Sequence, residues 1–297
     1  MELTWIDAFT DRPFAGNPAA VCVTADSVTT TSDAGPAWSL GDEAMQALAA
    51  ELGLSETAYL RRRGASGDNA AGDWDLRWFT PAAEVELCGH ATLASAHALW
   101  ESGRVAAGGE IRFHTLSGVL TAMRTADAAG AAWIELDFPA QPAVQQDPPH
   151  GLLAALGVEA RWVGTNGTDW LVEVASEAAV RSARPDLAAV ARMPARGVIV
   201  TAVAEGRDGE GKDGQAGADF VSRFFAPAVG VDEDPVTGSA HCCLAPFWAA
   251  RLGRTSLTGY QASPRGGHVR VELAGDRVRL AGQAVTVLRG ELAAQNL

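Results

Sequence analysis

Hydrophobic and polar positions along the chain predict many strands and a few helices. Between residues 42 and 52, apolar side chains recur three and four positions apart, which is typical of a helix. Asp42 suits the N-cap of this helix, because a short polar side chain can bind the free N–H groups there. Gly53 suits its end, because glycine tolerates a left-handed backbone. We therefore expect a helix from Asp42 to about Leu52.

Most other apolar residues alternate as they do in strands. Residues 3–23 predict two strands joined by a loop rich in Gly, Pro and Asn, and residues 54–60 predict a further strand. Residues 108–140 alternate on either side of a turn-rich gap. Residues 268–273 and 277–281 flank the short turn AGD, as the two strands of a hairpin would.

Two stretches show no periodicity at all. Residues 24–41 are rich in Ser and Thr and contain a proline, whereas residues 205–219 consist almost entirely of Gly and charged residues. We interpret both stretches as loops, the second of them inserted between strands.

An internal repeat is the strongest signal of domain organisation. The segment RWFTPA at 77–82 recurs as RFFAPA at 223–228, and CGHA at 88–91 recurs in outline as TGSA at 237–240. Each copy runs from an aromatic strand through an acidic loop to a glycine and a helix rich in Ala, Leu and Trp. Because the two copies are about half a chain length apart, the repeat predicts two equivalent halves.

The glycine before each of these helices indicates a binding site. Gly89 and Gly238 would let a ligand approach the first-turn N–H groups, which have no acceptor within the helix and lie at the positive end of its dipole. One anion site in each half, aimed at a cleft between the halves, would suit a small anionic ligand.

Several titratable residues stand close to these glycines. His90 could donate to a substrate or move a proton, and His241 has a weaker claim because it lies deeper in its helix. Asp234, held by Pro235, is the acidic residue best suited to orient a basic group or accept a proton. The other acidic residues of the two loops are interpreted as solvated charges: Glu84, Glu86, Asp232 and Glu233.

Composition narrows the possible partners. The 297 residues include 23 basic and 36 acidic side chains, a formal net charge of −13, which argues against nucleic acid as a partner. Apolar runs are too short to span a membrane, and the N-terminus lacks the basic residues of a secretory signal, so we expect a cytoplasmic protein with no membrane partner. The four cysteines, two of them adjacent, do not suggest a disulfide framework.

Metal binding is the competing interpretation of CGH at 88–90 and HCC at 241–243. Neither segment has the paired-ligand spacing of a zinc site, and two adjacent cysteines on a helix point to different faces. The glycine-rich loops that bind nucleotide phosphates are also missing from the sequence. We therefore expect neither a metal nor a cofactor.

Five segments together resemble the PhzF-like isomerases of phenazine biosynthesis, a family that shares the two-domain fold of diaminopimelate epimerase. The segments follow one another in the family's order and extend over almost the whole chain. They are IDAFTDRPFAGNPAAVCV at 6–23, MQALAAELGLSETAYL at 45–60, RWFTPAAEVELCGHATLASAHALW at 77–100, SRFFAPAVGVDEDPVTGSAH at 222–241 and GGHVRVELAGDRVRLAGQAVTVLRGEL at 266–292.

This resemblance implies an α+β fold of two pseudo-symmetric lobes, each a curved mixed β-sheet or barrel around a central α-helix. We expect the N-terminal lobe to comprise residues 1–117 with about 283–297, and the C-terminal lobe to comprise residues 118–282. The active site would lie in the cleft between them. Members of the family are commonly homodimers, so a homodimer is expected here as well.

The resemblance also implies a mechanism. It places the general acid/base at Glu56 in the motif Ser-Glu-Thr, with His90 and Asp234 as its catalytic partners. Substrate contacts map to Ser55, Gly89, Gly238 and Ser239. A carboxylate in a cleft that excludes water can take a proton from one carbon and return it to another. The implied function is a cofactor-independent isomerase acting on a small carboxylated substrate, amino-acid-like or cyclic; in the family's named reaction this is trans-2,3-dihydro-3-hydroxyanthranilate.

Two alternatives stay open. Epimerases and racemases of this fold use two thiols, and here Cys88 stands at the first thiol position whereas Thr237, a weak acid and base, stands at the second. Such an enzyme would need Cys88 together with some other partner. A catalytically silent protein that binds small carboxylates is the other alternative, because a fold does not by itself imply activity.

Overall fold

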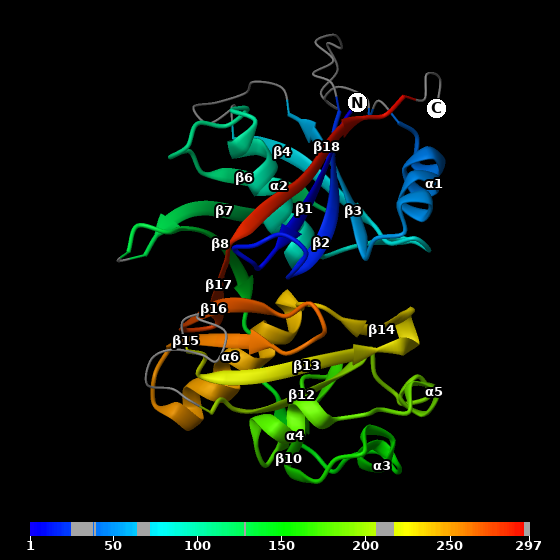
Figure 1. Ribbon diagram of the computed structural model, residues 1–297, viewed down its shortest axis with the longest axis vertical. Coiled ribbons are helices and arrows are strands. Elements are labelled where there is room, and N and C mark those ends of the chain that lie inside the picture. Colours follow the sequence, from blue (N-terminus) through cyan, green and yellow to red (C-terminus); the bar gives the residue numbers. More distant parts are fainter. Residues whose placement is uncertain (25–37, 39, 64–71, 128, 206–216, 294–297) are drawn as a thin grey trace. The chain divides into compact units, whose positions relative to one another are not determined.

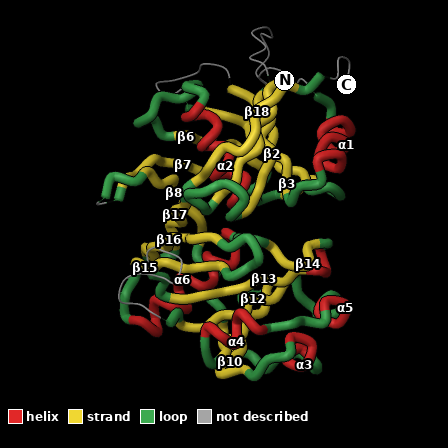
Figure 2. Tube along the Cα trace, in the orientation of Figure 1, coloured by secondary structure: helices red, strands yellow, loops and turns green. Residues whose placement is uncertain are grey.

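The computed structural model describes residues 1–24, 38, 40–63, 72–127, 129–205 and 217–293, and it divides the chain into two units (Figures 1 and 2). Unit 1 comprises Met1–Asp137 with Ala281–Leu297, and unit 2 comprises Phe138–Leu280. Most residues of the loops predicted at 24–41 and 205–219 lie outside the described part of the chain.

Unit 1 is a mixed β-sheet with two helices. Its elements are β1 (Glu2–Ala8), β2 (Asn17–Val23), α1 (Asp42–Leu52), β3 (Glu56–Arg62), β4 (Asp73–Phe79), β5 (Glu84–Val85), α2 (Gly89–Glu101), β6 (Ile111–Thr115), β7 (Gly118–Ala126), β8 (Ala132–Pro139) and β18 (Ala284–Glu291). The chain leaves this unit within β8. Strand β18 brings the chain back to unit 1 and pairs antiparallel with β1.

Unit 2 has the same general build with more helices. Its elements are β9 (Val144–Gln145), α3 (Leu152–Leu156), β10 (Ala160–Thr165), β11 (Asp169–Val174), α4 (Glu177–Ser182), α5 (Leu187–Val190), β12 (Gly197–Val203), β13 (Phe220–Ala226), a 3₁₀ turn (Pro227–Val229), β14 (Val231–Asp234), α6 (Gly238–Leu252), β15 (Ser256–Gln261), β16 (Gly267–Ala274) and β17 (Arg277–Gly282). With mixed sheets and a few helices, the chain has the predicted α+β fold class.

Strand pairing confirms the internal repeat. In unit 1 the pairs β1–β2, β3–β4, β4–β5 and β6–β7 are antiparallel, and the pairs β2–β3 and β4–β6 are parallel. In unit 2 the pairs β10–β11, β12–β13, β13–β14 and β15–β16 are antiparallel, and β11–β12 and β13–β15 are parallel. The two units therefore share one topology, in which α2 and α6 occupy equivalent places.

Helices α2 and α6 lie at the centres of the two units. Every residue of α2 from His90 to Ala96 is buried, and α2 packs against β1, β2, β3 and β18. Helix α6 is buried over most of its length and packs against β15 and β16. Both helices are apolar on nearly all sides, which is typical of a helix that sheets surround. Small side chains such as alanine let the strands approach closely.

Two details differ from the sequence predictions. The N-cap of α1 is Gly41 and not Asp42, whose carboxylate instead pairs with Arg77 of β4 at 2.7 Å. The turn-rich gap within residues 108–140 contains strand β7, which begins after a turn at Gly118 and pairs with both β6 and β8. Because of that pairing, residues 118–137 belong to unit 1.

The helices of the described residues are all too short or too polar to cross a lipid bilayer.

Gly16 offers a test of how tightly the loop before β2 is built. Its φ is +62°, and a Cβ there would lie 2.1 Å from the carbonyl oxygen of Ala8. Gly53 has the same φ, but a Cβ there would meet no atom within 4 Å. We expect Gly53→Ala to lower the free energy of unfolding by about 1 to 2 kcal/mol through backbone strain alone, and Gly16→Ala by about 3 kcal/mol or more because a backbone clash is added.

Urea denaturation of the two variants and the parent protein would measure this difference. Equal losses for the two variants would show that the loop can move away from Ala8, and would contradict the packing described here.

Candidate active site

In unit 1, the sheet and the central helix bring three predicted site residues together. Glu56 is the first residue of β3 and pairs with Ala19 of β2. Cys88 is the N-cap of α2, and His90 lies in its first turn. Glu56 lies far from Cys88 and His90 in sequence, and its contact with the His90 ring brings the start of β3 to the start of α2.

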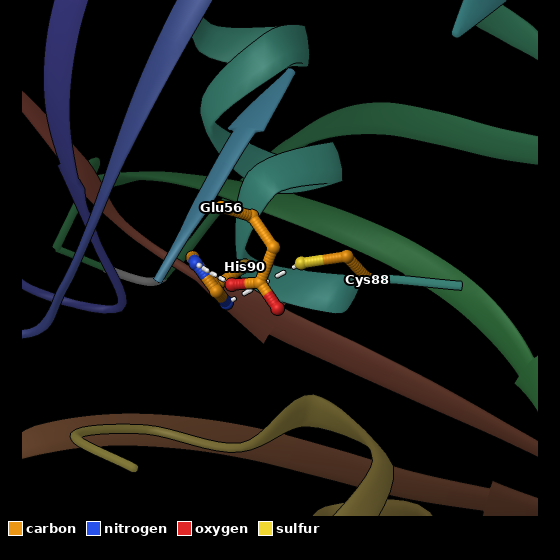
Figure 3. Close-up of side chains that lie close together, drawn as sticks. All are labelled: Glu56, Cys88 and His90. Atoms are coloured by element: carbon orange, nitrogen blue, oxygen red, sulfur yellow. Dashed lines mark hydrogen bonds and ion pairs between the residues drawn. The ribbon is translucent and has the colours of Figure 1, made fainter. Parts of the chain in front are cut away.

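His90 is the centre of this cluster (Figure 3). Its Nε2 lies 3.2 Å from Oε2 of Glu56, and its Nδ1 lies 3.2 Å from Nδ2 of Asn17 and 3.5 Å from Sγ of Cys88. The contact with Glu56 is close but falls outside hydrogen-bond geometry in this conformation. A small rotation of either side chain would align it, and catalytic hydrogen bonds often become aligned only when a substrate binds.

The orientation of the Asn17 amide is coupled to which nitrogen of His90 carries the proton. The amide oxygen of Asn17 accepts from the hydroxyl of Ser55 at 3.5 Å, so the amide NH₂ faces His90. An NH₂ group can only donate, and Nδ1 must therefore be the unprotonated nitrogen. The proton is then on Nε2, which lies 3.2 Å from Oε2 of Glu56.

Burial keeps His90 neutral. The side chain is 6% exposed, and desolvation lowers the pKa of His90 from 6.5 to about 3. A neutral Nε2–H is a hydrogen-bond donor that does not place a full positive charge beside Glu56. The Glu56 side chain is 19% exposed, although its Oε2, which faces His90, is buried.

The helix start supplies further donors. The first hydrogen bond within α2 runs from the N–H of Thr92 to the carbonyl of Cys88. The N–H groups of Gly89 and His90 precede it and have no acceptor within the helix. Gly89 and Ser55 therefore lie at this centre, as the predicted substrate contacts require, although their roles stay predictions.

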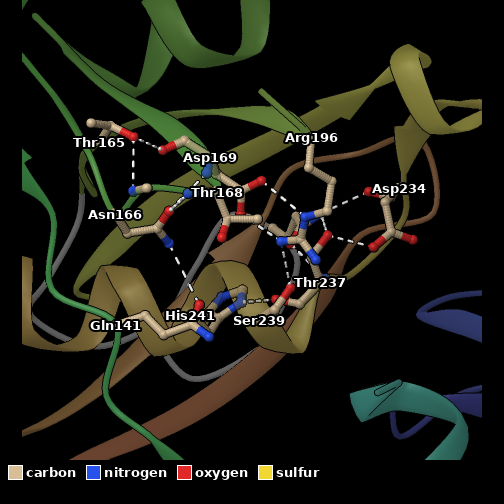
Figure 4. A network of polar contacts seen from close by, with 12 residues as sticks. Gln141, Thr165, Asn166, Thr168, Asp169, Arg196, Asp234, Thr237, Ser239 and His241 are labelled. Carbon is tan, nitrogen blue, oxygen red and sulfur yellow. Dashed lines mark hydrogen bonds and ion pairs between the residues drawn. The ribbon is translucent and has the colours of Figure 1, made fainter. Parts of the chain in front are cut away.

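In unit 2, the equivalent helix start has a different set of side chains (Figure 4). Thr237 is the N-cap of α6, and its hydroxyl donates to the carboxylate of Asp234. Gln261 of β15 holds the same corner, because its side chain bonds both the backbone N–H of Thr237 and the carbonyl of Asp234. Asp234 thus lies beside Gly238 and Ser239, where the sequence placed it.

Arg196 is the residue of this centre that sequence reasoning missed. Its guanidinium forms a two-pronged ion pair with the fully buried carboxylate of Asp169 and donates from Nη2 to the hydroxyl of Ser239 at 2.9 Å. Asp169 therefore holds a cation at the start of α6. Burial lowers the pKa of Arg196, whereas the carboxylates of Asp169 and Asp234 raise it. The net result is a raised pKa, so Arg196 stays charged.

The repeat shows that Arg196 occupies the place of the acid/base motif. Arg77 lies opposite Tyr59 in β3–β4, and Arg223 lies opposite Val200 in β12–β13. Counting back along each strand aligns Ser55 with Arg196 and Glu56 with Gly197, just as Gly89 aligns with Gly238. The Arg196–Ser239 contact of unit 2 therefore falls at the positions of Ser55 and His90 in unit 1, and Gly197 stands where unit 1 has Glu56.

Two acidic residues interpreted as solvated are in fact structural partners of the repeated arginines. Arg77 binds both carboxylate oxygens of Glu84, at 2.7 and 2.8 Å, and Arg223 binds those of Glu233 at the same distances. Each pair ties the strand before the acidic loop to the loop itself. The Arg in the repeated motif thus fixes the approach to each helix start.

His241 belongs to the core of unit 2. It is completely buried, its Nδ1 donates to the carbonyl of Thr237 at 2.8 Å, and burial lowers its pKa to about 4. The ring packs beside Phe220. This buried position agrees with the expectation that His241 is less suited than His90 to a functional role.

Known proteins share both the sequence and the architecture of this chain. The sequence model of the PhzC-PhzF family, described as phenazine biosynthesis-like protein, matches residues 6–290. An uncharacterized isomerase of Halalkalibacterium halodurans is 46% identical over 288 residues, covering 97% of this chain and 96% of that protein. The crystal structure of a PhzF-family phenazine biosynthesis protein from Enterococcus faecalis has a TM-score of 0.84 at 35% identity and covers 99% of both chains. A probable proline racemase from Agrobacterium radiobacter K84 shares the fold, with a TM-score of 0.59 at 15% identity over 99% of this chain and 93% of that one.

The protein is therefore an isomerase with the α+β fold of the racemases and epimerases, which confirms the predicted fold class. The chain belongs to the PhzC-PhzF family, as the sequence resemblance implied. The expected homodimer and cytoplasmic location stay predictions.

Asn17 provides a test of the proton arrangement on His90. In Asn17→Asp, a carboxylate that only accepts would face Nδ1, so we expect the proton to move to Nδ1 and the pKa of His90 to rise above its parent value of about 3. Nitrogen NMR shifts of the His90 ring, followed as a function of pH, report both quantities.

Asn17→Ala is the control, because it removes the contact without adding a charge. An unchanged tautomer and an unchanged pKa in Asn17→Asp would show that Asn17 does not set the state of His90.

Proposed function

We propose that this protein is a cofactor-independent isomerase in which Glu56 takes a proton from one carbon of a small carboxylated substrate and returns it to another. The observation that carries this proposal is the contact of 3.2 Å between the Glu56 carboxylate and Nε2 of a neutral, buried His90 at the start of α2. One carboxylate that serves both steps must first accept a proton and then donate it. His90 can hold Glu56 in place during both steps.

The surroundings of Glu56 suit this chemistry. Proton removal next to a carboxylate or an unsaturated bond leaves negative charge spread over the substrate. The N–H groups of Gly89 and His90, at the positive end of α2, can stabilise such a charge without rearranging.

We propose that unit 2 recognises the anionic group of the substrate. Arg196 is held by Asp169, Ser239 accepts one of its N–H donors, and the hydroxyl proton of Ser239 remains available for a ligand. Guanidinium and hydroxyl donors together suit a carboxylate.

The contacts of Thr237 favour an isomerase over a two-thiol racemase. A racemase of this fold would need a second acid/base at residue 237, opposite Cys88. The hydroxyl proton of Thr237 is instead engaged by the Asp234 carboxylate, and a threonine hydroxyl is too weak an acid for the role. The family's named reaction supports a cyclic dihydro-hydroxyanthranilate, or a related amino-acid-like compound, as the substrate.

Glu56→Gln tests the proposed acid/base. We expect turnover to fall by about 10²- to 10⁴-fold, because an amide cannot shuttle the proton. Deuterium incorporation from heavy water into dihydro-hydroxyanthranilate and a panel of small amino acids and cyclic carboxylic acids, followed by NMR, would measure it. Glu51→Gln, an equivalent change on the exposed face of α1, should retain full activity.

The exchange assay and calorimetry together separate the alternatives. Exchange at the substrate α-carbon that Cys88→Ser abolishes and Glu56→Gln does not would establish the epimerase or racemase. Calorimetric binding of a carboxylate with no exchange into it would establish the silent binding protein.

Arg196→Gln tests the proposed recognition site. Loss of a charged hydrogen bond to the substrate is worth about 1.5 to 3 kcal/mol, so we expect KM to rise by about 10- to 100-fold with little change in kcat. Arg251→Gln is the control, because Arg251 also pairs with a carboxylate of unit 2, that of Glu173, but at the other end of α6. A fall in kcat with KM unchanged would refute the binding role.

A further inference from the structure

Three different metal-ligand atoms converge at the start of α2. A carboxylate oxygen of Glu56, the thiol sulfur of Cys88 and a ring nitrogen of His90 all lie within 4.8 Å of one another (Figure 3). The sequence argues against a zinc site because CGH lacks paired-ligand spacing. The third donor comes from β3, which no local motif could reveal.

The spacing of these atoms is close to that of a metal shell. A tetrahedral Zn²⁺ has ligand bonds of about 2.3 Å to sulfur and about 2.0 Å to nitrogen and oxygen, which separates the ligand atoms from each other by about 3.3 to 3.6 Å. Nε2 of His90 and Oε2 of Glu56 already lie 3.2 Å apart. Sγ of Cys88 lies 3.5 Å from Nδ1 of the same ring, and the three ligand atoms lie within 4.8 Å of one another, so the side chains would have to move closer together to surround a cation.

The neighbouring residues can adapt to a cation. Metal binding through Nε2 requires the His90 proton to sit on Nδ1, where it needs an acceptor. A half-turn of the Asn17 amide presents its oxygen to Nδ1 and its NH₂ group to Ser55, whose hydroxyl can donate or accept.

We propose that Glu56, Cys88 and His90 form a binding site for one thiophilic divalent cation of the Zn²⁺ and Cd²⁺ class. The cation replaces the thiol proton of Cys88, which is released to solvent, and the fourth coordination position stays open on the exposed side of Glu56. Imidazole, thiolate and carboxylate are the three ligand types that Zn²⁺ takes in proteins. A bound cation would occupy the carboxylate that the proposed function uses, so it would inhibit isomerisation reversibly.

Cadmium titration of the purified protein tests the site without any substrate. We expect the near-ultraviolet thiolate-to-cadmium charge-transfer band to saturate at one Cd²⁺ per chain and to disappear in Cys88→Ser. Cys22→Ser is the matched control, because Cys22 is completely buried in the same unit and burial raises its pKa to about 12, so it should leave the band unchanged.

A second variant keeps the test informative if Cys88→Ser proves unstable. We expect Glu56→Gln to retain the band but to weaken Cd²⁺ affinity by at least about 10-fold, because it removes one ligand. Zn²⁺ should displace Cd²⁺ and remove the band. A band that survives in Cys88→Ser, or an affinity that Glu56→Gln does not change, would overturn the proposal.

The readout is independent of the proposed function. If the parent protein binds Cd²⁺ as described but Glu56→Gln isomerises at the normal rate, the acid/base role is refuted and the metal site stands. If the parent protein fails to bind Cd²⁺ but Glu56→Gln abolishes exchange activity, the metal site is refuted and the acid/base role stands.

Discussion

Each unit depends on one constraint, the burial of an apolar helix inside a curved sheet. Helix α2 is buried from His90 to Ala96, and its packing partners are strands on several sides. Within such a helix every backbone N–H is satisfied except those of the first turn. The first turn is therefore where a buried helix remains able to bind a ligand, and the functional candidates of both units gather there.

The repeat keeps this scaffold and varies the chemistry at the helix start. The two-pronged Arg–Glu pairs, Arg77 with Glu84 and Arg223 with Glu233, are the same in both units because each fixes the loop that leads into the central helix. At the equivalent positions beyond them, Ser55 and His90 of unit 1 correspond to Arg196 and Ser239 of unit 2, and Gly197 stands where unit 1 has the carboxylate of Glu56. The duplicated fold thus keeps one backbone arrangement while the side chains at the helix start differ between the two units.

Much of the scaffold follows from sequence patterns, because local periodicity and the repeat determine it. The strands of residues 3–23, helix α1 and both central helices lie where the patterns place them. Glu56 could be identified only through the family resemblance, because nothing local distinguishes it from an exposed strand charge. Asn17 and Arg196 went unnoticed for a different reason: their partners His90 and Ser239 are 73 and 43 residues away, and only strand pairing brings them together.

The side chains of unit 1 also show why proton transfer and metal binding draw on one arrangement. A proton acceptor needs an accessible lone pair, and a neighbour that holds it without a competing charge. Burial of His90 supplies the second condition, because desolvation removes the positive charge that the ring would otherwise carry near pH 6.5. The same ring has a thiol and a carboxylate beside it, and the ligand atoms of the three groups lie within 4.8 Å of one another. The proposed acid/base and the proposed cation site therefore share Glu56, so substrate and cation would compete for one carboxylate.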